Sequence, residues 1–183
     1  TVFIVGRWLP AATGGLGEVG GSYRMYLIDS ENSELSEASR FPTFRRGVAR
    51  SVAALRAAGK RVVLMGGVPE PGYDVPTILA LASHNGAAHP GAPLRANVEH
   101  DYSEIDSYFR TLGGGRPDVT FIPVWPSLCE PECSLSTRGI ALFSDDDHLT
   151  AAAAQDVLGP LLTPHLTALF PPPATNSDTS HPY

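Results

Sequence analysis

The stretch that most constrains the fold is a helical pattern joined by one tight turn to a short apolar run. Over residues 40–59 the apolar side chains recur at the spacing of one helix face, at Phe44, Val48, Val52 and Leu55. Gly59 is suited to end that helix, and the run at residues 61–65 (Arg-Val-Val-Leu-Met) follows directly. Such a run is typical of a strand buried on both faces of a sheet. The stretch therefore predicts half of a βαβ unit.

The other apolar patterns extend this prediction to an open parallel sheet with helices on both faces. Further strands are expected at residues 1–5, 118–124 and 139–143, with a short edge strand at 23–28. Further helices are expected at 75–83, 102–112 and 150–170, the last bent or divided by Pro160 and Pro164. The glycine-rich residues 9–21 and the polar residues 84–97 are expected to be loops.

Composition indicates one globular domain. The chain has 183 residues, of which 43% are hydrophobic, so it can bury a sizeable core. We expect the domain to cover residues 1–170 and the Pro/Ser/Thr-rich residues 171–183 to form a disordered tail. A net charge of −6 argues against a nucleic-acid partner, which usually requires basic clusters. Thr1 stands inside an apolar, strand-like run, so we expect the natural polypeptide to continue before it.

The two cysteines, Cys129 and Cys133, favour a small disulfide. They form half of a zinc site at best, since no second Cys or His pair has matching spacing. A loop this short would contribute roughly 2 kcal/mol in the chain-entropy model. An oxidised pair would indicate a compartment outside the cytosol. The alternative is two buried free thiols.

The motif with the clearest chemical meaning is the polar stretch after residues 139–143. Asp145 and His148 are three residues apart on an expected loop, and Thr150 is placed to cap the next helix. This spacing lets a carboxylate accept the Nδ1 proton of an imidazole, while Nε2 faces outward as a general base. Three other interpretations remain open. Asp145 to Asp147 could form a solvated acidic turn with His148 capping the loop, they could be an oxygen-ligand site for Mg²⁺ or Ca²⁺, or Asp146 and Asp147 could be favourable charges at a helix N-terminus.

Several unusual residues follow the expected strands. Arg7 and Trp8 follow the first strand, residues 66–72 the second, and Trp125 the third. The carboxyl ends of parallel strands lie at one end of a sheet, so these residues and the Asp145–His148 loop are expected to form one site. Arg7 is expected to contact substrate. Trp8 and Trp125 are either core residues or platforms that stack on a sugar.

Four motifs resemble one known family. They are Phe-Ile-Val-Gly-Arg-Trp at 3–8, Val-Val-Leu-Met-Gly-Gly-Val-Pro-Glu-Pro-Gly at 62–72, Leu-Cys at 128–129 with Cys133, and Ser-Asp-Asp-Asp-His-Leu-Thr at 144–150. In this order they resemble the SGNH domain that is fused to integral-membrane acyltransferases of the acyltransferase-3 type, which O-acylate bacterial envelope sugars. The resemblance implies a flavodoxin-like three-layer α/β/α sandwich with a mainly parallel sheet, truncated at its N-terminus.

The resemblance also implies a function. Asp145 and His148 would be the orienting carboxylate and general base of a serine esterase or O-acyltransferase, with Arg7 and Trp8 near the substrate. The family's nucleophile lies in a Gly-Asp-Ser motif that this sequence lacks, so it would precede Thr1. The implied partners are an acylated glycan or acyl donor and a covalently fused membrane domain. The implied location is the extracytoplasmic side of the membrane, and no cofactor or metal is required.

Three functional alternatives follow. The first is the catalytic role above, for which the chain alone would be inactive. The second is a non-catalytic glycan-binding or accessory module with a degenerate SGNH fold. The third is a metal-dependent hydrolase that uses the aspartate cluster. Ser144 is not a suitable nucleophile, because it lacks the Gly-x-Ser-x-Gly turn and lies on the same tight loop as His148.

Overall fold

A computed structural model describes residues 1–14, 25–86 and 91–169 of the chain. Its centre is a parallel sheet in the order β1 (Val2–Ile4), β2 (Val62–Met65) and β3 (Val119–Ile122). Val62 of the central strand is in register with Val2 on one side and Val119 on the other. The predicted strands at residues 1–5, 61–65 and 118–124 are therefore confirmed, with slightly shorter bounds.

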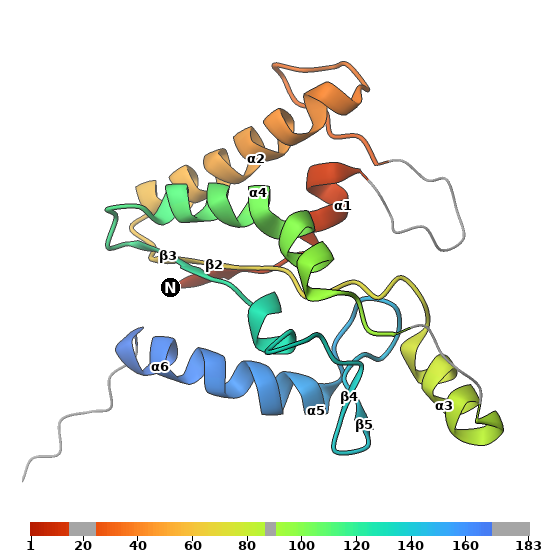
Figure 1. The fold of residues 1–183 in the computed structure, drawn as a ribbon. Helices are drawn as coiled ribbons and strands as arrows, with labels where there is room; N and C mark the ends of the chain where they lie inside the picture. Colours follow the sequence, from red (N-terminus) through yellow and green to blue (C-terminus); the bar gives the residue numbers. More distant parts are fainter. Residues whose placement is uncertain (15–24, 87–90, 170–183) are drawn as a thin grey trace, which may run out of the picture.

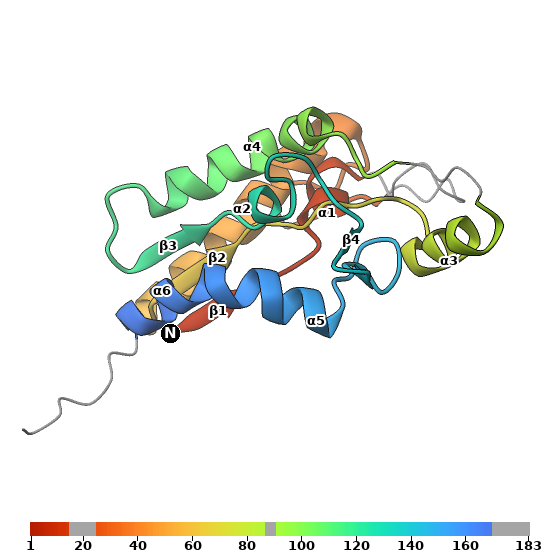
Figure 2. The same cartoon turned by 60° about the horizontal axis from the view of Figure 1, so that its bottom comes forward.

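Helices cover both faces of this sheet, as the α/β prediction requires (Figures 1 and 2). One face carries α1 (Trp8–Thr13), α2 (Glu37–Ala57) and α4 (Arg95–Gly113). The opposite face carries a continuous C-terminal helical segment made of α5 (Ala151–Ala153), the π-helical turn η2 (Ala154–Leu158) and α6 (Gly159–Leu169). Two elements lie beyond the carboxyl ends of the strands: α3 (Val75–Asn85) and the 3-10 helix η1 (Trp125–Leu128).

The central strand divides the hydrophobic core into two parts. Val62 and Leu64 pack among side chains of α1, α2 and α4, whereas Val63 and Met65 pack against the C-terminal helical segment. This division follows from the alternation of side chains along a strand. All four residues are buried, which explains why β2 reads as an unbroken apolar run.

The structure corrects four of the predicted elements. Residues 139–143 do not add a strand to the parallel sheet: β5 (Ile140–Ala141) pairs with β4 (Ser136–Thr137) in a separate antiparallel hairpin. The expected loop at 9–21 contains α1. Helix α4 begins at Arg95 rather than at residue 102, and residues 25–28 form no strand. The rest of the expected edge strand and the expected tail at 171–183 lie outside the described residues.

Candidate active site

The Asp145–His148 loop is closed at its base by main-chain pairing. Phe143 and Leu149 form an antiparallel bridge, and the N–H of Ser144 donates to the carbonyl of His148 at 2.8 Å. Thr150 then caps α5, because its hydroxyl accepts a hydrogen bond from the N–H of Ala153, as predicted. The loop is thus a short, internally bonded turn at the start of the C-terminal helical segment.

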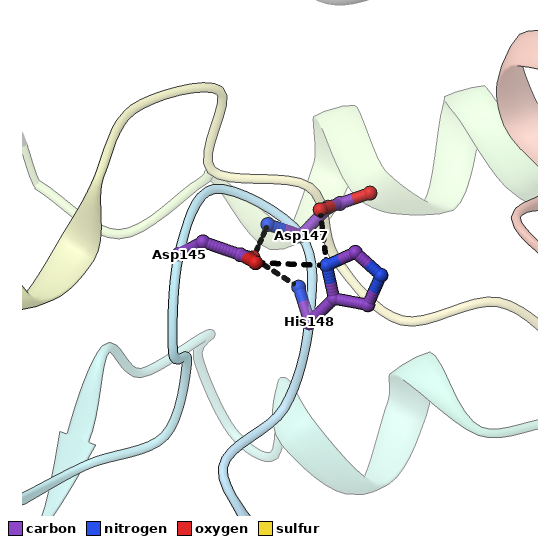
Figure 3. A group of neighbouring side chains, drawn as sticks. All are labelled: Asp145, Asp147 and His148. Carbon is purple, nitrogen blue, oxygen red and sulfur yellow. Dashed lines mark hydrogen bonds and ion pairs between the residues drawn. The ribbon is translucent and has the colours of Figure 1, made fainter.

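Asp145 holds both the turn and the imidazole (Figure 3). Its Oδ1 accepts hydrogen bonds from the N–H groups of Asp147 (3.0 Å) and His148 (2.7 Å). Its Oδ2 lies 2.9 Å from Nδ1 of His148. A carboxylate can only accept, so Nδ1 carries the proton of this hydrogen bond and Nε2 is the unprotonated nitrogen of the neutral ring. The side chain of His148 is 73% exposed, which leaves Nε2 accessible.

These contacts shift the pKa values of both residues in the direction that supports an ion pair. The two backbone N–H groups, followed by the hydrogen bond to His148, lower the pKa of Asp145 to about 2. The hydrogen bond to Asp145, followed by the charge of Asp147, raises the pKa of His148 above its usual value. Asp145 is therefore ionised at neutral pH and favours protonation of the imidazole beside it.

Asp147 is not the solvated helix charge that the sequence suggested. It is buried, and its Oδ2 lies 2.7 Å from Nε of Arg7. Its Oδ1 lies 2.9 Å from Nδ1 of His148, on the other side of the carboxylate. Burial raises the pKa of Asp147, and the charge of Arg7 opposes that rise. Asp147 thus lies between Arg7, which follows β1, and the imidazole of His148, and contacts both.

Arg7 lies at the carboxyl end of β1, where the sequence predicted a site residue. Its Nη2 donates to Oε2 of Glu70 at 2.7 Å, and Glu70 lies on the loop after β2. This hydrogen bond is the largest cause of a raised Arg7 pKa. The loops that follow β1 and β2 and the Asp145–His148 loop are therefore brought together, as expected. They line a cavity of about 300 Å³ that also contacts Tyr102 of α4.

Sequence reasoning assigned no role to Glu70 or Tyr102. Tyr102 is buried, its hydroxyl donates to the carbonyl of Val68 at 2.8 Å, and its ring packs against Gly67. A Cβ on Gly67 would lie 2.6 Å from the phenol oxygen, so the Tyr102 ring would have to move to admit any side chain there. The sequence signal that could have identified Glu70 is its position in Gly-Gly-Val-Pro-Glu-Pro-Gly, directly after a buried strand.

The two tryptophans lie in the core and do not line this cavity. Trp8 is 8% exposed, packs edge-on against Phe109 and donates its indole N–H to the carbonyl of Met65 at 2.6 Å. Trp125 is buried as well and donates to Asp106 at 3.1 Å. As the first residue of α1, Trp8 packs in the core against Phe44 and Phe109, and its contact with substrate stays a prediction. Of the expected substrate contacts, Arg7 alone lies at the cavity.

The cysteine loop does not line this cavity. Cys129 and Cys133 form a disulfide, and Cys129 is fully buried. Arg95, the first residue of α4, donates to the carbonyl of Cys129 and forms a 2.7 Å ion pair with Glu130. These contacts fix the disulfide loop to α4.

Asp145, Asp147 and His148 have the residue types of a cation site, with ligand atoms within 4.8 Å of one another. The structure gives these atoms other partners. Arg7 already compensates the charge of Asp147, and Asp145 is engaged by two N–H groups and the imidazole. The contacts therefore favour the acid–base interpretation over the metal-dependent one.

A parallel α/β/α domain with an Asp–His pair at the carboxyl end of its sheet carries two of the groups that acyl-transfer and esterase chemistry uses. Comparison with protein families makes the assignment specific. Residues 1–163 match the model of the SGNH domain that is fused to AT3 domains, and the chain belongs to this family. The resemblance seen in the four sequence motifs is thereby confirmed.

One solved structure similar to the chain is the periplasmic domain of a lipopolysaccharide acetyltransferase from Salmonella ser. Paratyphi A. The identity is 19%, the TM-score is 0.47, and the match covers 76% of this chain. The chain spans 54% of the length of that domain. No match was found among curated proteins. Within the residues that the structure covers, no helix has the length and apolar character needed to cross a membrane.

Proposed function

We propose that this chain is part of an SGNH-type serine esterase or O-acyltransferase domain that acts on O-acyl groups of bacterial cell-envelope glycans. His148 is the general base, and Asp145 orients its ring. The observation that carries the proposal is the hydrogen bond of 2.9 Å between Asp145 and Nδ1, which leaves Nε2 exposed for a hydroxyl. Membership of the SGNH family supports the same assignment.

The nucleophile of this proposal is a serine outside the 183 residues. Ser144 is the nearest serine in the sequence, but its hydroxyl donates to the carbonyl of His148 at 3.2 Å rather than to the ring. In the reaction, Nε2 accepts the proton of the serine as its Oγ attacks the acyl carbonyl. The leaving group of the acyl donor departs with that proton from Nε2, which gives the acyl-serine. Water or a sugar hydroxyl then attacks the acyl-serine, Nε2 takes the proton of the attacking group, and Nε2 returns it to Oγ as the serine is released.

The setting of the domain is part of the proposal. The family consists of SGNH domains fused to AT3 domains, so we propose a covalently fused membrane acyltransferase domain in the parent protein. The domain then lies on the extracytoplasmic side of the membrane. The solved neighbour is described as a periplasmic domain, and a disulfide such as Cys129–Cys133 persists in an oxidising compartment.

A fluorophosphonate probe tests the catalytic assignment. The probe phosphonylates an activated serine with loss of fluoride, so the parent protein should be labelled and its His148→Ala variant should not. The 183-residue chain alone should give no label and little turnover of an activated acetyl ester. A parent protein that binds its glycan but shows neither labelling nor turnover would instead support the non-catalytic binding module. Turnover by the isolated chain that His148→Ala abolishes would place the nucleophile inside these residues.

A further inference from the structure

A second carboxylate lies against the proposed general base. Nδ1 of His148 is 2.9 Å from Asp145 and also 2.9 Å from Asp147. Nδ1 carries one hydrogen, and the hydrogen bond at this atom is made to Asp145. Asp145 therefore suffices to select the tautomer, and the position of Asp147 requires a separate explanation.

Asp147 is held in place from its other side. One carboxylate oxygen contacts His148, while the other lies 2.7 Å from Nε of Arg7. The side chain of Asp147 is only 5% exposed, and an ionised carboxylate is costly to bury unless it is paired. Arg7 is itself anchored by Glu70 on the loop after β2. The arrangement thus keeps a negative charge beside the imidazole.

Building on the proposed role of His148 as general base, we propose that Asp147 is a second positioning residue for His148 and that Arg7 holds it there. Asp145 orients the ring and selects its tautomer. Asp147 adds electrostatic stabilisation of the imidazolium that forms when Nε2 accepts the serine proton. Both carboxylates stay ionised during this transfer, so the proton moves only between the serine Oγ and Nε2.

The charged groups around His148 act in opposite directions. Asp145, Asp146 and Asp147 are on its own loop, Arg7 follows β1, and Glu70 follows β2 and contacts Arg7. The carboxylates of Asp145 and Asp147 favour the protonated ring, and Arg7 opposes it. Removing Asp147 should therefore lower the pKa of His148.

An NMR titration of His148 in the 183-residue chain tests this inference without any need for turnover. The His148 signals are assigned by their loss in His148→Gln. In Asp147→Asn the His148 pKa should fall below that of the wild type. Asp146→Asn is the matched control, because it removes the same charge one residue away and should shift the pKa less. Asp147→Glu retains a carboxylate and should restore the pKa towards the wild-type value.

A His148 pKa in Asp147→Asn no lower than in the Asp146→Asn control would overturn the inference, since a purely structural role would change stability alone. If the Asn variant does not fold, Asp147→Ser is compared with Asp146→Ser. A lower His148 pKa in Asp147→Ser than in Asp146→Ser supports the inference, and an equal or higher pKa overturns it. Failure of the serine-probe experiment would overturn the proposed reaction and leave this titration result in place, so the two failures are distinguishable.

Discussion

Asp145 binds His148 twice, through its backbone N–H at 2.7 Å and through its ring Nδ1 at 2.9 Å. The same carboxylate therefore fixes the position of the Cα and the rotation of the imidazole. A residue that only balanced charge would need neither bond, so this double contact is the geometry of an orienting group.

The first prediction concerns this contact. In the parent protein, Asp145→Asn should lower kcat/KM for acyl transfer by roughly 10²–10⁴-fold, because an amide N–H₂ group can point at Nδ1 and favour the wrong tautomer. His148→Ala should lower it at least as much. The measurement is steady-state turnover of an activated acetyl ester, with Asp146→Asn as the control that leaves the rate near that of the wild type. Retained activity in either site variant would remove that residue from the reaction.

The second prediction concerns the pH dependence of the rate. His148 works as a base only when neutral, so kcat/KM of the parent protein should rise with pH as His148 loses its proton. The hydrogen bond to Asp145 and the charge of Asp147 raise the pKa of His148, so the midpoint should lie above the ordinary value of 6.5. A midpoint below 6.5 would contradict the pairing seen in the structure.

The third prediction concerns stability in acid. The pKa of Asp145 is 3.8 in its ordinary state and about 2 in the folded protein. The folded state therefore binds a proton less readily than the unfolded state. The resulting stabilisation is present above pH 3.8 and is lost as the pH falls towards 2. Urea unfolding of the chain between pH 5 and pH 2 should show this loss, and Asp145→Asn should show a smaller one. Equal slopes for the two proteins would contradict the prediction.

The fourth prediction separates a core role of Trp8 from substrate binding. Trp8→Ala should lower the free energy of unfolding by about 3–5 kcal/mol, because it removes a large buried side chain. Trp8→Phe keeps most of that volume but leaves the carbonyl of Met65 without its donor, which should cost about 1–3 kcal/mol. Chemical unfolding measures both changes. In the parent protein, Trp8→Phe should leave KM unchanged at a temperature where it is folded, and a raised KM would indicate substrate contact.

The fifth prediction concerns the close approach of Tyr102 to Gly67. In Gly67→Ala the new methyl group would overlap the phenol ring, so the ring must move and its hydrogen bond to Val68 is lost. The melting temperature of Gly67→Ala should fall, and the NMR signals of the loop after β2 should change. Gly47→Ala is the matched control: its Cβ meets nothing within 4 Å on α2, so it should be neutral or stabilising by up to about 1 kcal/mol. Equal melting temperatures in the two variants would contradict the described packing.

The parts of the fold that were predicted correctly depend on short-range patterns. Strand β2 is apolar throughout because both of its faces are covered, and the heptad-like spacing before it marks the buried face of α2. Asp145 and His148 were paired correctly because three residues separate them on one turn. For the Asp145–His148 pair the two partners are also neighbours in the sequence, whereas for β2 and α2 the apolar pattern itself indicates the burial.

The prediction at residues 139–143 was wrong for a physical reason. Leu142 and Phe143 are apolar because they pack in the core beneath the sheet, and they do not pair with a parallel strand. Arg138 and Gly139 adopt left-handed conformations with φ of 49° and 77°, which turns the chain back into the β4–β5 hairpin. An apolar run indicates that a segment is buried, but it does not indicate which strand the segment pairs with.

The roles of Glu70 and Asp147 depend on contacts between distant segments. Glu70 reaches Arg7 from the loop after β2, and Arg7 reaches Asp147 from the end of β1. The sequence predicted that these segments meet, because parallel strands place their carboxyl ends together. It could not predict which carboxylate of the loop is buried, since Asp145, Asp146 and Asp147 are alike in composition and differ only in where the turn directs them.

The bridge between Phe143 and Leu149 has a consequence for how the acid–base pair forms. Because the main chain pairs at both ends of the loop, Asp145 meets His148 without any long-range closure of the chain. The Arg7–Asp147 contact, in contrast, depends on β1 docking against β2. Orientation of the base is thus a local property, and its electrostatic reinforcement is a property of the assembled sheet. A substitution that loosens the docking of β1 should therefore reduce the electrostatic support of His148 before it changes the orientation of the imidazole ring.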